Sequence, residues 1–85
     1  MKTFAYTIKD ALGIHARPAG MLVKQAAEFQ SEITISAKGK QASLKKLFAL
    51  MGLGVRQGDT VKITVEGTDE AEAADMLEKF FEEKL

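Results

Sequence analysis

The residues with the clearest chemical potential lie close together near the amino terminus. The chain has a single histidine, His15, and an arginine, Arg17, follows two residues later. Pro18 and the apolar pattern after it predict a helix that begins at Ala16, so His15 stands where a loop becomes a helix. The N-terminus of a helix carries unpaired N–H groups and a partial positive charge, and both favour a bound anion.

This position suits His15 for phosphoryl chemistry. The field of the helix disfavours the imidazolium form, so a ring nitrogen stays available as a nucleophile near neutral pH. The Arg17 guanidinium can bind the same anion through its planar set of N–H donors. These features together predict transient phosphorylation of His15. The alternative is a purely structural role, which is common for a lone histidine near a helix start.

Composition excludes several other kinds of site. The chain has 85 residues, no cysteine, and 12 basic against 12 acidic residues. Without cysteine there is no disulfide, thiolate zinc site or thiol nucleophile, and one histidine cannot build a multi-histidine metal centre within one chain. Dinucleotide-binding and phosphate-loop glycine motifs are absent as well. We therefore expect no metal, no cofactor and no complete catalytic cycle carried out by this chain alone.

The length and hydropathy of the chain set its organisation. Eighty-five residues suffice for one domain, so we expect a single domain over residues 1–85. No apolar run approaches the length of a membrane span, and the first residues lack the apolar stretch of a signal peptide. We therefore expect a soluble cytoplasmic protein with no membrane insertion.

The charge of the chain is unevenly distributed. Residues 1–58 hold nine basic and three acidic residues, whereas residues 59–85 hold three basic and nine acidic ones. This asymmetry predicts a basic face that could meet an acidic partner. Two solvated faces without a partner are the alternative.

Hydrophobic periodicity predicts seven elements. Alternating patterns indicate strands over residues 2–8, 32–37 and 60–66, and the Lys38-Gly39 turn predicts a short return strand over 40–42. Helical patterns cover residues 16–29 and 44–51, and a last helix follows Asp69. The order βαββαβα, with one polar face on each strand, predicts an open-faced α+β sandwich with helices on one side of the sheet.

Several local features refine these helices. The stripe of the first helix is Ala19, Leu22, Val23, Ala26 and Ala27, and that of the last is Ala73, Ala74, Leu77, Phe80 and Phe81. Gly20 interrupts the first stripe, and close packing on the sheet would explain it. Ser43 is expected to cap the second helix, and Asp69 with Glu72 to form a capping box at the start of the third.

The stretch Gly13–Gly20, with the sequence GIHARPAG, resembles the active-site signature of the HPr family. These proteins are the histidine-containing phosphocarriers of the bacterial phosphoenolpyruvate-dependent sugar phosphotransferase system. The similarity extends over the whole chain, including residues 44–48, 53–55 and 67–70, and length and element order agree. The resemblance implies a four-stranded antiparallel sheet covered on one face by three helices.

The resemblance also implies a phosphoryl relay in which the chain is a carrier and not an enzyme. Enzyme I would phosphorylate Nδ1 of His15, and the group would then pass to the enzyme IIA component of a sugar transporter. Arg17 would stabilise the phosphoryl group, with the backbone amides of Ala16 and Arg17 as further donors. Transfer of this kind depends on positioning and charge compensation, which a small carrier can supply.

The second helix has more apolar residues than one narrow stripe can bury. We expect Leu47, Phe48 and Met51 to reach the surface near His15, in the part of the chain that the resemblance assigns to partner binding. A basic rim would surround them, formed by Arg17, Lys24, Lys45 and Lys46. The alternative places all five apolar residues of this helix, which include Leu44 and Leu50, in the core.

One position departs from the family pattern. Many members, especially in Gram-positive bacteria, carry a regulatory serine that a dedicated kinase phosphorylates, and this chain has Lys46 there. We therefore expect no regulatory serine. The substitution leaves open whether the chain serves sugar uptake or a specialised phosphorelay.

Two other functions compete with this interpretation. A regulatory module could use His15 only as a sensor, but the presence of both His15 and Arg17 argues against it. A nucleic-acid binder is disfavoured by the zero net charge and by Tyr6 as the only tyrosine. A carrier that presents one small face to several partners is expected to be a monomer.

Overall fold

Four strands and three helices alternate along the chain in the predicted order βαββαβα. The computed structural model describes all residues from 1 to 85. Its elements are β1 (Lys2–Thr7), α1 (Ala16–Ala26), β2 (Glu32–Ala37), β3 (Lys40–Ser43), α2 (Leu47–Met51), β4 (Thr60–Glu66) and α3 (Glu70–Lys84). The strands form one antiparallel sheet in the order β1-β4-β2-β3. The two strands at the centre, β4 and β2, are therefore brought together across a long connection.

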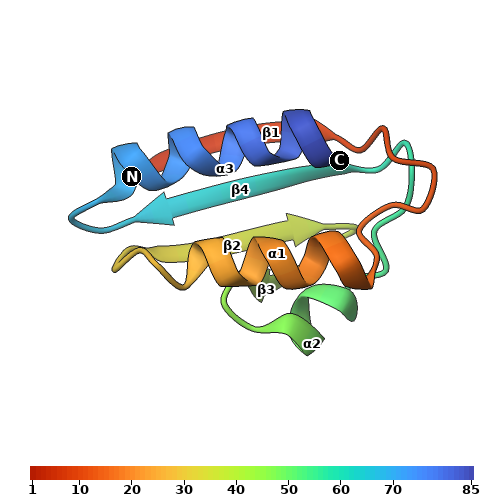
Figure 1. Cartoon of the computed structure of the whole chain (residues 1–85), viewed down its shortest axis with the longest axis horizontal. Coiled ribbons are helices and arrows are strands. Elements are labelled where there is room, and N and C mark those ends of the chain that lie inside the picture. The colour runs from red at the N-terminus through yellow and green to blue at the C-terminus, as the bar shows by residue number, and fades with distance from the viewer.

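The helices lie on one face of this sheet. Figure 1 shows α1 and α3 side by side over the strands, with α2 beside α1 near the β3 edge. The inward residues of β4, namely Val61, Ile63 and Val65, are fully buried beneath them. Leu22 of α1 and Phe81 of α3 are also fully buried, so the predicted stripes meet the sheet. This arrangement confirms the predicted open-faced sandwich.

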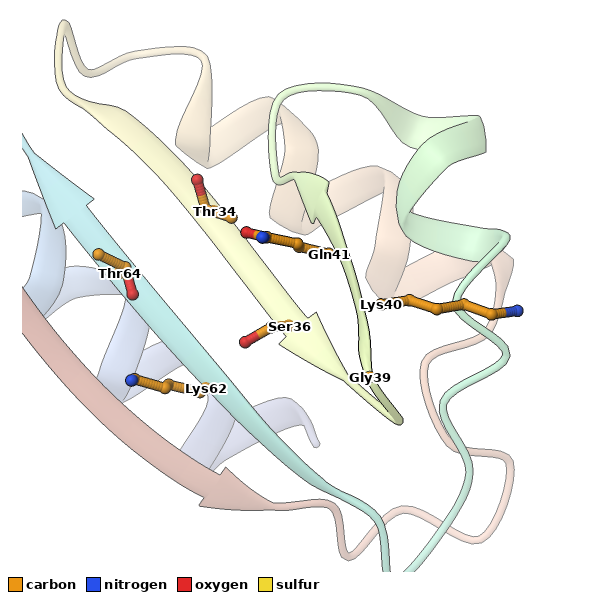
Figure 2. Close-up of a pocket in the computed structure, with 7 residues that line it drawn as sticks. All are labelled: Thr34, Ser36, Gly39, Lys40, Gln41, Lys62 and Thr64. Atoms are coloured by element: carbon orange, nitrogen blue, oxygen red, sulfur yellow. The ribbon is translucent and has the colours of Figure 1, made fainter.

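The other face of the sheet is polar and open. Thr3, Thr64, Thr34 and Ser43 stand in register across all four strands, which gives a continuous row of hydroxyl-bearing residues. A shallow hollow on this face has no hydrophobic lining residue, and Figure 2 shows the side chains that surround it. None of the predicted site residues belongs to this hollow, so the sheet face is separate from the His15 region.

The first helix is shorter than its pattern predicted. It ends at Ala26, and Ala27, which the predicted stripe included, is exposed. The amides of Glu28 and Phe29 bond to carbonyls three residues earlier, so the chain tightens into a turn before β2 begins. The early end has a tertiary cause, because the following amides of Gln30 and Ser31 are bonded to Asp69 of the α3 start.

The second helix is also shorter, and Ser43 does not cap it. Leu44 is fully buried and its amide bonds to the carbonyl of Ile33, so this residue continues the β2–β3 pairing. The Ser43 hydroxyl accepts the Lys45 amide at 3.1 Å, and the helix begins only after Lys46. Burial of Leu44 against β2 therefore delays the helix by one turn.

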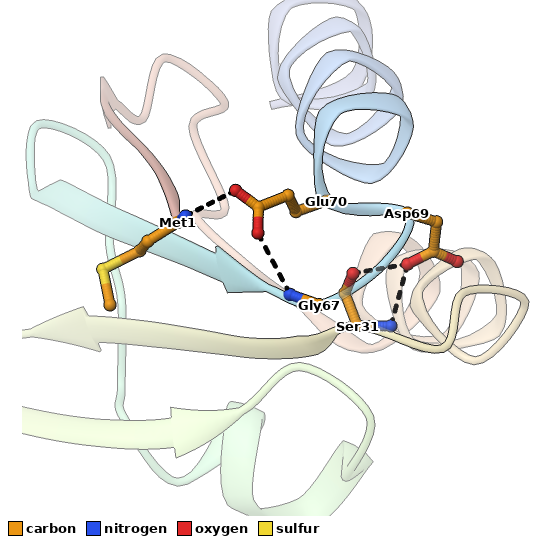
Figure 3. Close-up of polar contacts among 5 residues, drawn as sticks. All are labelled: Met1, Ser31, Gly67, Asp69 and Glu70. Carbon is orange, nitrogen blue, oxygen red and sulfur yellow. Dashed lines mark hydrogen bonds and ion pairs between the residues drawn. The ribbon is translucent and has the colours of Figure 1, made fainter.

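The predicted capping box at the third helix is wrong. The Asp69 side chain makes no cap bond to its own helix. It accepts the amides of Gln30 and Ser31 at 2.8 and 2.9 Å, and it also accepts the Ser31 hydroxyl. Figure 3 shows this contact between the α3 start and the segment before β2. The Ser31 hydroxyl, and after it the Gln30 amide, lower the pKa of Asp69.

A neighbouring carboxylate serves the start of the helix instead. Glu70 accepts the Gly67 amide at 3.2 Å, and its second oxygen lies 2.5 Å from the amino group of Met1 (Figure 3). The Met1 amino group, followed by the Gly67 amide, lowers the pKa of Glu70. The first strand and the last helix are thereby joined at one end of the molecule.

Candidate functional site

His15 is the N-cap residue of α1, as the sequence predicted. Its backbone is extended, with φ −101° and ψ −178°, and its carbonyl accepts the Ala19 amide at 2.9 Å. The backbone N–H groups of Ala16 and Arg17 have no partner within the chain. Pro18, in the same first turn, has no N–H to satisfy. The site therefore combines an imidazole with two free amides at a helix N-terminus.

The loop before His15 is held from two directions. The amide of Ile14 bonds to the Val55 carbonyl at 3.2 Å, which connects the loop to the segment after α2. The amide of Gly13 bonds to the Asp10 carbonyl at 2.9 Å. The Lys9 and Asp10 amides in turn donate to the backbone oxygen of Leu85, at the end of α3. The position of His15 thus depends on segments that are far apart in the sequence.

His15 and Arg17 line one shallow depression. The other lining residues are Asp10, Pro18, Met21 and Lys84. The Arg17 side chain is exposed and makes no ion pair or hydrogen bond within the chain, so it is free to reach an anion beside His15. The Nε2 atom of His15 lies 3.9 Å from Oδ2 of Asp10, which is within ion-pair range but too long for a hydrogen bond, and Nδ1 has no polar partner in the chain.

The apolar residues of α2 divide between core and surface. Leu44, just before the helix, and Leu50 are buried, and Leu47 is half-buried against the core. Phe48 is 85% exposed and Met51 is 39% exposed. The prediction of surface exposure is therefore correct for Phe48 and Met51 and half correct for Leu47. Because α2 packs against α1, and the segment after α2 bonds to Ile14, α2 lies beside α1 and is connected to the loop that precedes His15 (Figure 1).

The predicted basic rim is only partly available. Lys24 in the last turn of α1 and Lys46 before α2 are both exposed. Lys45, in contrast, is half-buried, and its Nζ donates to the Phe29 carbonyl at 2.7 Å. That bond connects the end of α1 to the segment before α2, so the Lys45 ammonium already has a partner within the chain.

Three residues near His15 were missed by sequence reasoning. Leu12 is 71% exposed in the loop before His15, and Met21 is 42% exposed in α1. Met21 follows Arg17 by four residues, so its place on the same helix face was available from the spacing. Asp10 was interpreted only as a turn residue, and no local pattern indicates that its carboxylate faces the imidazole.

No three histidine, aspartate or glutamate side chains gather in an arrangement suited to a metal ion. None of the helices has the length and apolar character needed to cross a membrane. The carboxylates of α3 are mostly exposed along its outer side, as expected from their spacing.

Comparison with known proteins connects these features to one family. Residues 2–83 match the family described as the PTS HPr component phosphorylation site. The phosphocarrier protein HPr of Lysinibacillus sphaericus is 46% identical over 77 residues, which cover 91% of this chain and 88% of that protein. The HPr of Mycoplasma pneumoniae is 40% identical over 83 residues, which cover 96% and 94% of the two chains.

Solved structures agree with this result. A histidine-containing phosphocarrier protein from Mycoplasma has a TM-score of 0.91 at 35% identity, covering 93% of this chain and 90% of its own. HPr from Thermoanaerobacter tengcongensis has a TM-score of 0.85 at 40% identity and covers all of both chains. Another structure from the same organism, described as an HPr dimer, has a TM-score of 0.79 at 40% identity and covers 99% and 97% of the two chains.

Proposed function

The chain belongs to the HPr family of phosphocarrier proteins of the phosphotransferase system, and on that premise we propose that His15 carries the phosphoryl group. The protein is a phosphoryl carrier and not a catalyst. The observation that carries the assignment to His15 is its place at the α1 N-terminus, beside two unpaired amides and in one depression with Arg17. The acceptor atom is Nδ1, which is supported by its freedom from any contact with a carboxylate, whereas Nε2 lies 3.9 Å from Oδ2 of Asp10.

Arg17 and the helix amides stabilise the transferred group. The phosphoryl oxygens are negatively charged, and the guanidinium offers a planar pair of donors without a competing partner in the chain. The N–H groups of Ala16 and Arg17 point to the same end of the helix, where the partial positive charge of α1 also favours an anion. Phosphoryl transfer to His15 requires no proton to be removed from a substrate. Correct positioning of the ring and compensation of the phosphoryl charge therefore suffice for the transfer.

The partners are enzyme I as donor and enzyme IIA components as acceptors. Partner binding uses exposed Phe48 and Met51, with half-buried Leu47 beside them. Lys24 and Lys46 supply the positive rim that an acidic partner would meet. Lys45 stabilises the same region through its hydrogen bond to the Phe29 carbonyl. An apolar centre with a basic edge is a typical arrangement for a docking surface.

The proposal includes the setting in which the carrier works. Residues 1–85 act as a single HPr domain that works as a monomer in the cytoplasm, presenting one face to successive partners. Serine-dependent regulation is absent, because Lys46 occupies the position of the regulatory serine. The exposed ammonium of Lys46 adds positive charge next to α2 instead.

The test is phosphoryl transfer from phosphoenolpyruvate through enzyme I. The wild-type protein should gain one acid-labile, base-stable phosphate, and His15→Ala should gain none. Phosphorus NMR of the labelled protein distinguishes attachment at Nδ1 from attachment at Nε2. Label that persists in His15→Ala, or absence of label in the wild type, would refute the proposal.

A further inference from the structure

We propose that Asp10 is a positioning residue for His15, whose carboxylate keeps the proton of the imidazole on Nε2 and leaves Nδ1 for the phosphoryl group. This inference rests on the proposed function, since it concerns the same ring. Its starting point is the distance of 3.9 Å between Oδ2 of Asp10 and Nε2 of His15. Both side chains are about one-third exposed, so the pair lies at the rim of the depression and not in the core.

The carboxylate of Asp10 is held in place by its own loop. Oδ1 accepts the Leu12 amide at 2.8 Å, so this oxygen is already engaged. The backbone amide of Asp10 donates to Leu85, and its carbonyl accepts the Gly13 amide. Three bonds therefore fix the residue, and the remaining oxygen, Oδ2, is the one that faces the ring.

Asp10 is the only acidic side chain among the residues that line the depression. The charged residues of the depression are Asp10, Arg17 and Lys84, together with His15 itself. Neither Arg17 nor Lys84 forms an ion pair with Asp10 within 4.0 Å. The carboxylate is therefore available to attract an N–H donor from the ring. A neutral imidazole has one donor nitrogen and one acceptor nitrogen, and a carboxylate beside Nε2 favours the tautomer with the proton there.

This tautomer matters when the phosphoryl group arrives. The lone pair of Nδ1 forms the bond to phosphorus while the bond between phosphorus and the donor breaks. The ring then carries a positive charge, shared between Nδ1 and the protonated Nε2. The Asp10 carboxylate lies beside that charge, so it favours the phosphorylated ring that keeps its proton on Nε2 over the ring that has lost it.

The same contact assists departure of the group. When the N–P bond breaks, its electron pair returns to Nδ1, and the phosphoryl group passes to an acceptor nucleophile or to water. The ring leaves as neutral imidazole with its proton still on Nε2. Without that proton the leaving group would be an imidazolate, which is a far poorer one. Asp10 thus favours a short-lived, readily transferred phosphoryl group.

The experiment compares Asp10→Asn with Glu78→Gln. Asparagine keeps an oxygen for the Leu12 amide but removes the charge, and Glu78→Gln removes one exposed charge from α3. Nitrogen NMR of imidazole-labelled protein reports the tautomer of unphosphorylated His15, and phosphorus NMR follows loss of the group to water. For Asp10→Asn we expect a smaller fraction of His15 with its proton on Nε2, and a phosphohistidine lifetime about two- to fivefold longer. A rate change of this size is what the loss of one exposed ion pair produces. Glu78→Gln should match the wild type.

The outcomes separate this inference from the proposed function. If the wild type takes no label, the proposed function fails, while the nitrogen spectra still test Asp10. If the wild type is labelled but Asp10→Asn keeps both the tautomer fraction and the lifetime of the wild type, the inference is wrong. Label found on Nε2 of the wild type would also overturn it. Asp10→Ser retains a hydroxyl oxygen for the Leu12 amide and should show the same effect. Agreement of the two variants excludes an effect of the asparagine side-chain amide itself.

Discussion

The backbone of Gly13 lies directly against the carbonyl of Val55. A Cβ atom built on Gly13 would stand 2.3 Å from that oxygen, and Gly13 has a φ of +67°. The contact presses the loop that precedes His15 onto the segment that follows α2. His15 and the helix α2 are thus joined by two stretches of backbone.

Gly13→Ala should destabilise the protein and slow its phosphorylation. The new methyl group would clash with Val55, and alanine at a positive φ is strained, so we expect a loss of about 1–3 kcal/mol in the free energy of unfolding. Urea unfolding measures the loss, and transfer from enzyme I measures the effect on His15.

Gly20→Ala is the matched control for that change. A Cβ at Gly20 meets nothing within 4 Å, which shows that close packing on the sheet, as expected from the sequence, is not the reason for this glycine. Alanine has the higher helix propensity, so the variant should gain about 0.5–1 kcal/mol in stability. Equal losses in both variants would contradict the account of the Gly13–Val55 contact.

In Asp69→Asn, the free energy of unfolding should fall less steeply than in the wild type as the pH is lowered. Hydrogen bonds from Ser31 and Gln30 hold the pKa of Asp69 below its ordinary value, so the folded state binds fewer protons than the unfolded one as the pH falls. The contribution of Asp69 is present above the unfolded pKa and is lost as the pH drops through the folded pKa, in the range below about pH 4. Urea unfolding of both proteins between pH 2 and pH 7 tests this; parallel curves would refute it.

Phe48→Ala should weaken partner binding without unfolding the protein. The ring is 85% exposed, so its loss should change stability by less than about 0.5 kcal/mol. If it contacts enzyme I, the KM for this carrier should rise by roughly tenfold, as for a residue at the centre of an interface. Met76→Ala removes another exposed apolar side chain, on α3, and should leave the KM unchanged. A similar KM change in both variants would argue against a specific role for α2.

Lys45 and Lys46 should behave differently although they are neighbours of the same type. Lys45→Met removes the bond to the Phe29 carbonyl and should cost about 1–2 kcal/mol of stability. Lys46→Met removes an exposed charge and should leave stability nearly unchanged while slowing association with an acidic partner at low salt. Thermal unfolding and salt-dependent binding rates separate the two effects. Equal stability losses in the two variants would show that the bond from Lys45 to Phe29 contributes little to the free energy of unfolding.

Strand positions and the place of His15 were predictable because they depend on local periodicity. The bounds of β2 and β4 agree with their alternating patterns, since each buries one face of an extended chain. Helix ends were less predictable. Burial of Leu44 against β2 delayed α2, and bonds from Asp69 to Gln30 and Ser31 replaced the expected cap of α3. In each case a partner distant in the sequence outweighed a local preference.

The sequence by itself determined the order of elements, the polar and apolar faces of the strands, and an imidazole at a helix N-terminus beside Arg17. Those features follow from the side-chain period and from the residue types within one turn of His15. Only the tertiary structure decided that Lys45 is tied to Phe29, that Gly13 lies against Val55, and that the Asp10 carboxylate faces Nε2. The first two contacts arise where separate segments meet, and the loop that directs Asp10 is held by Leu85 at the other end of the chain. Their geometry is therefore set by packing and by hydrogen bonds that no local pattern encodes.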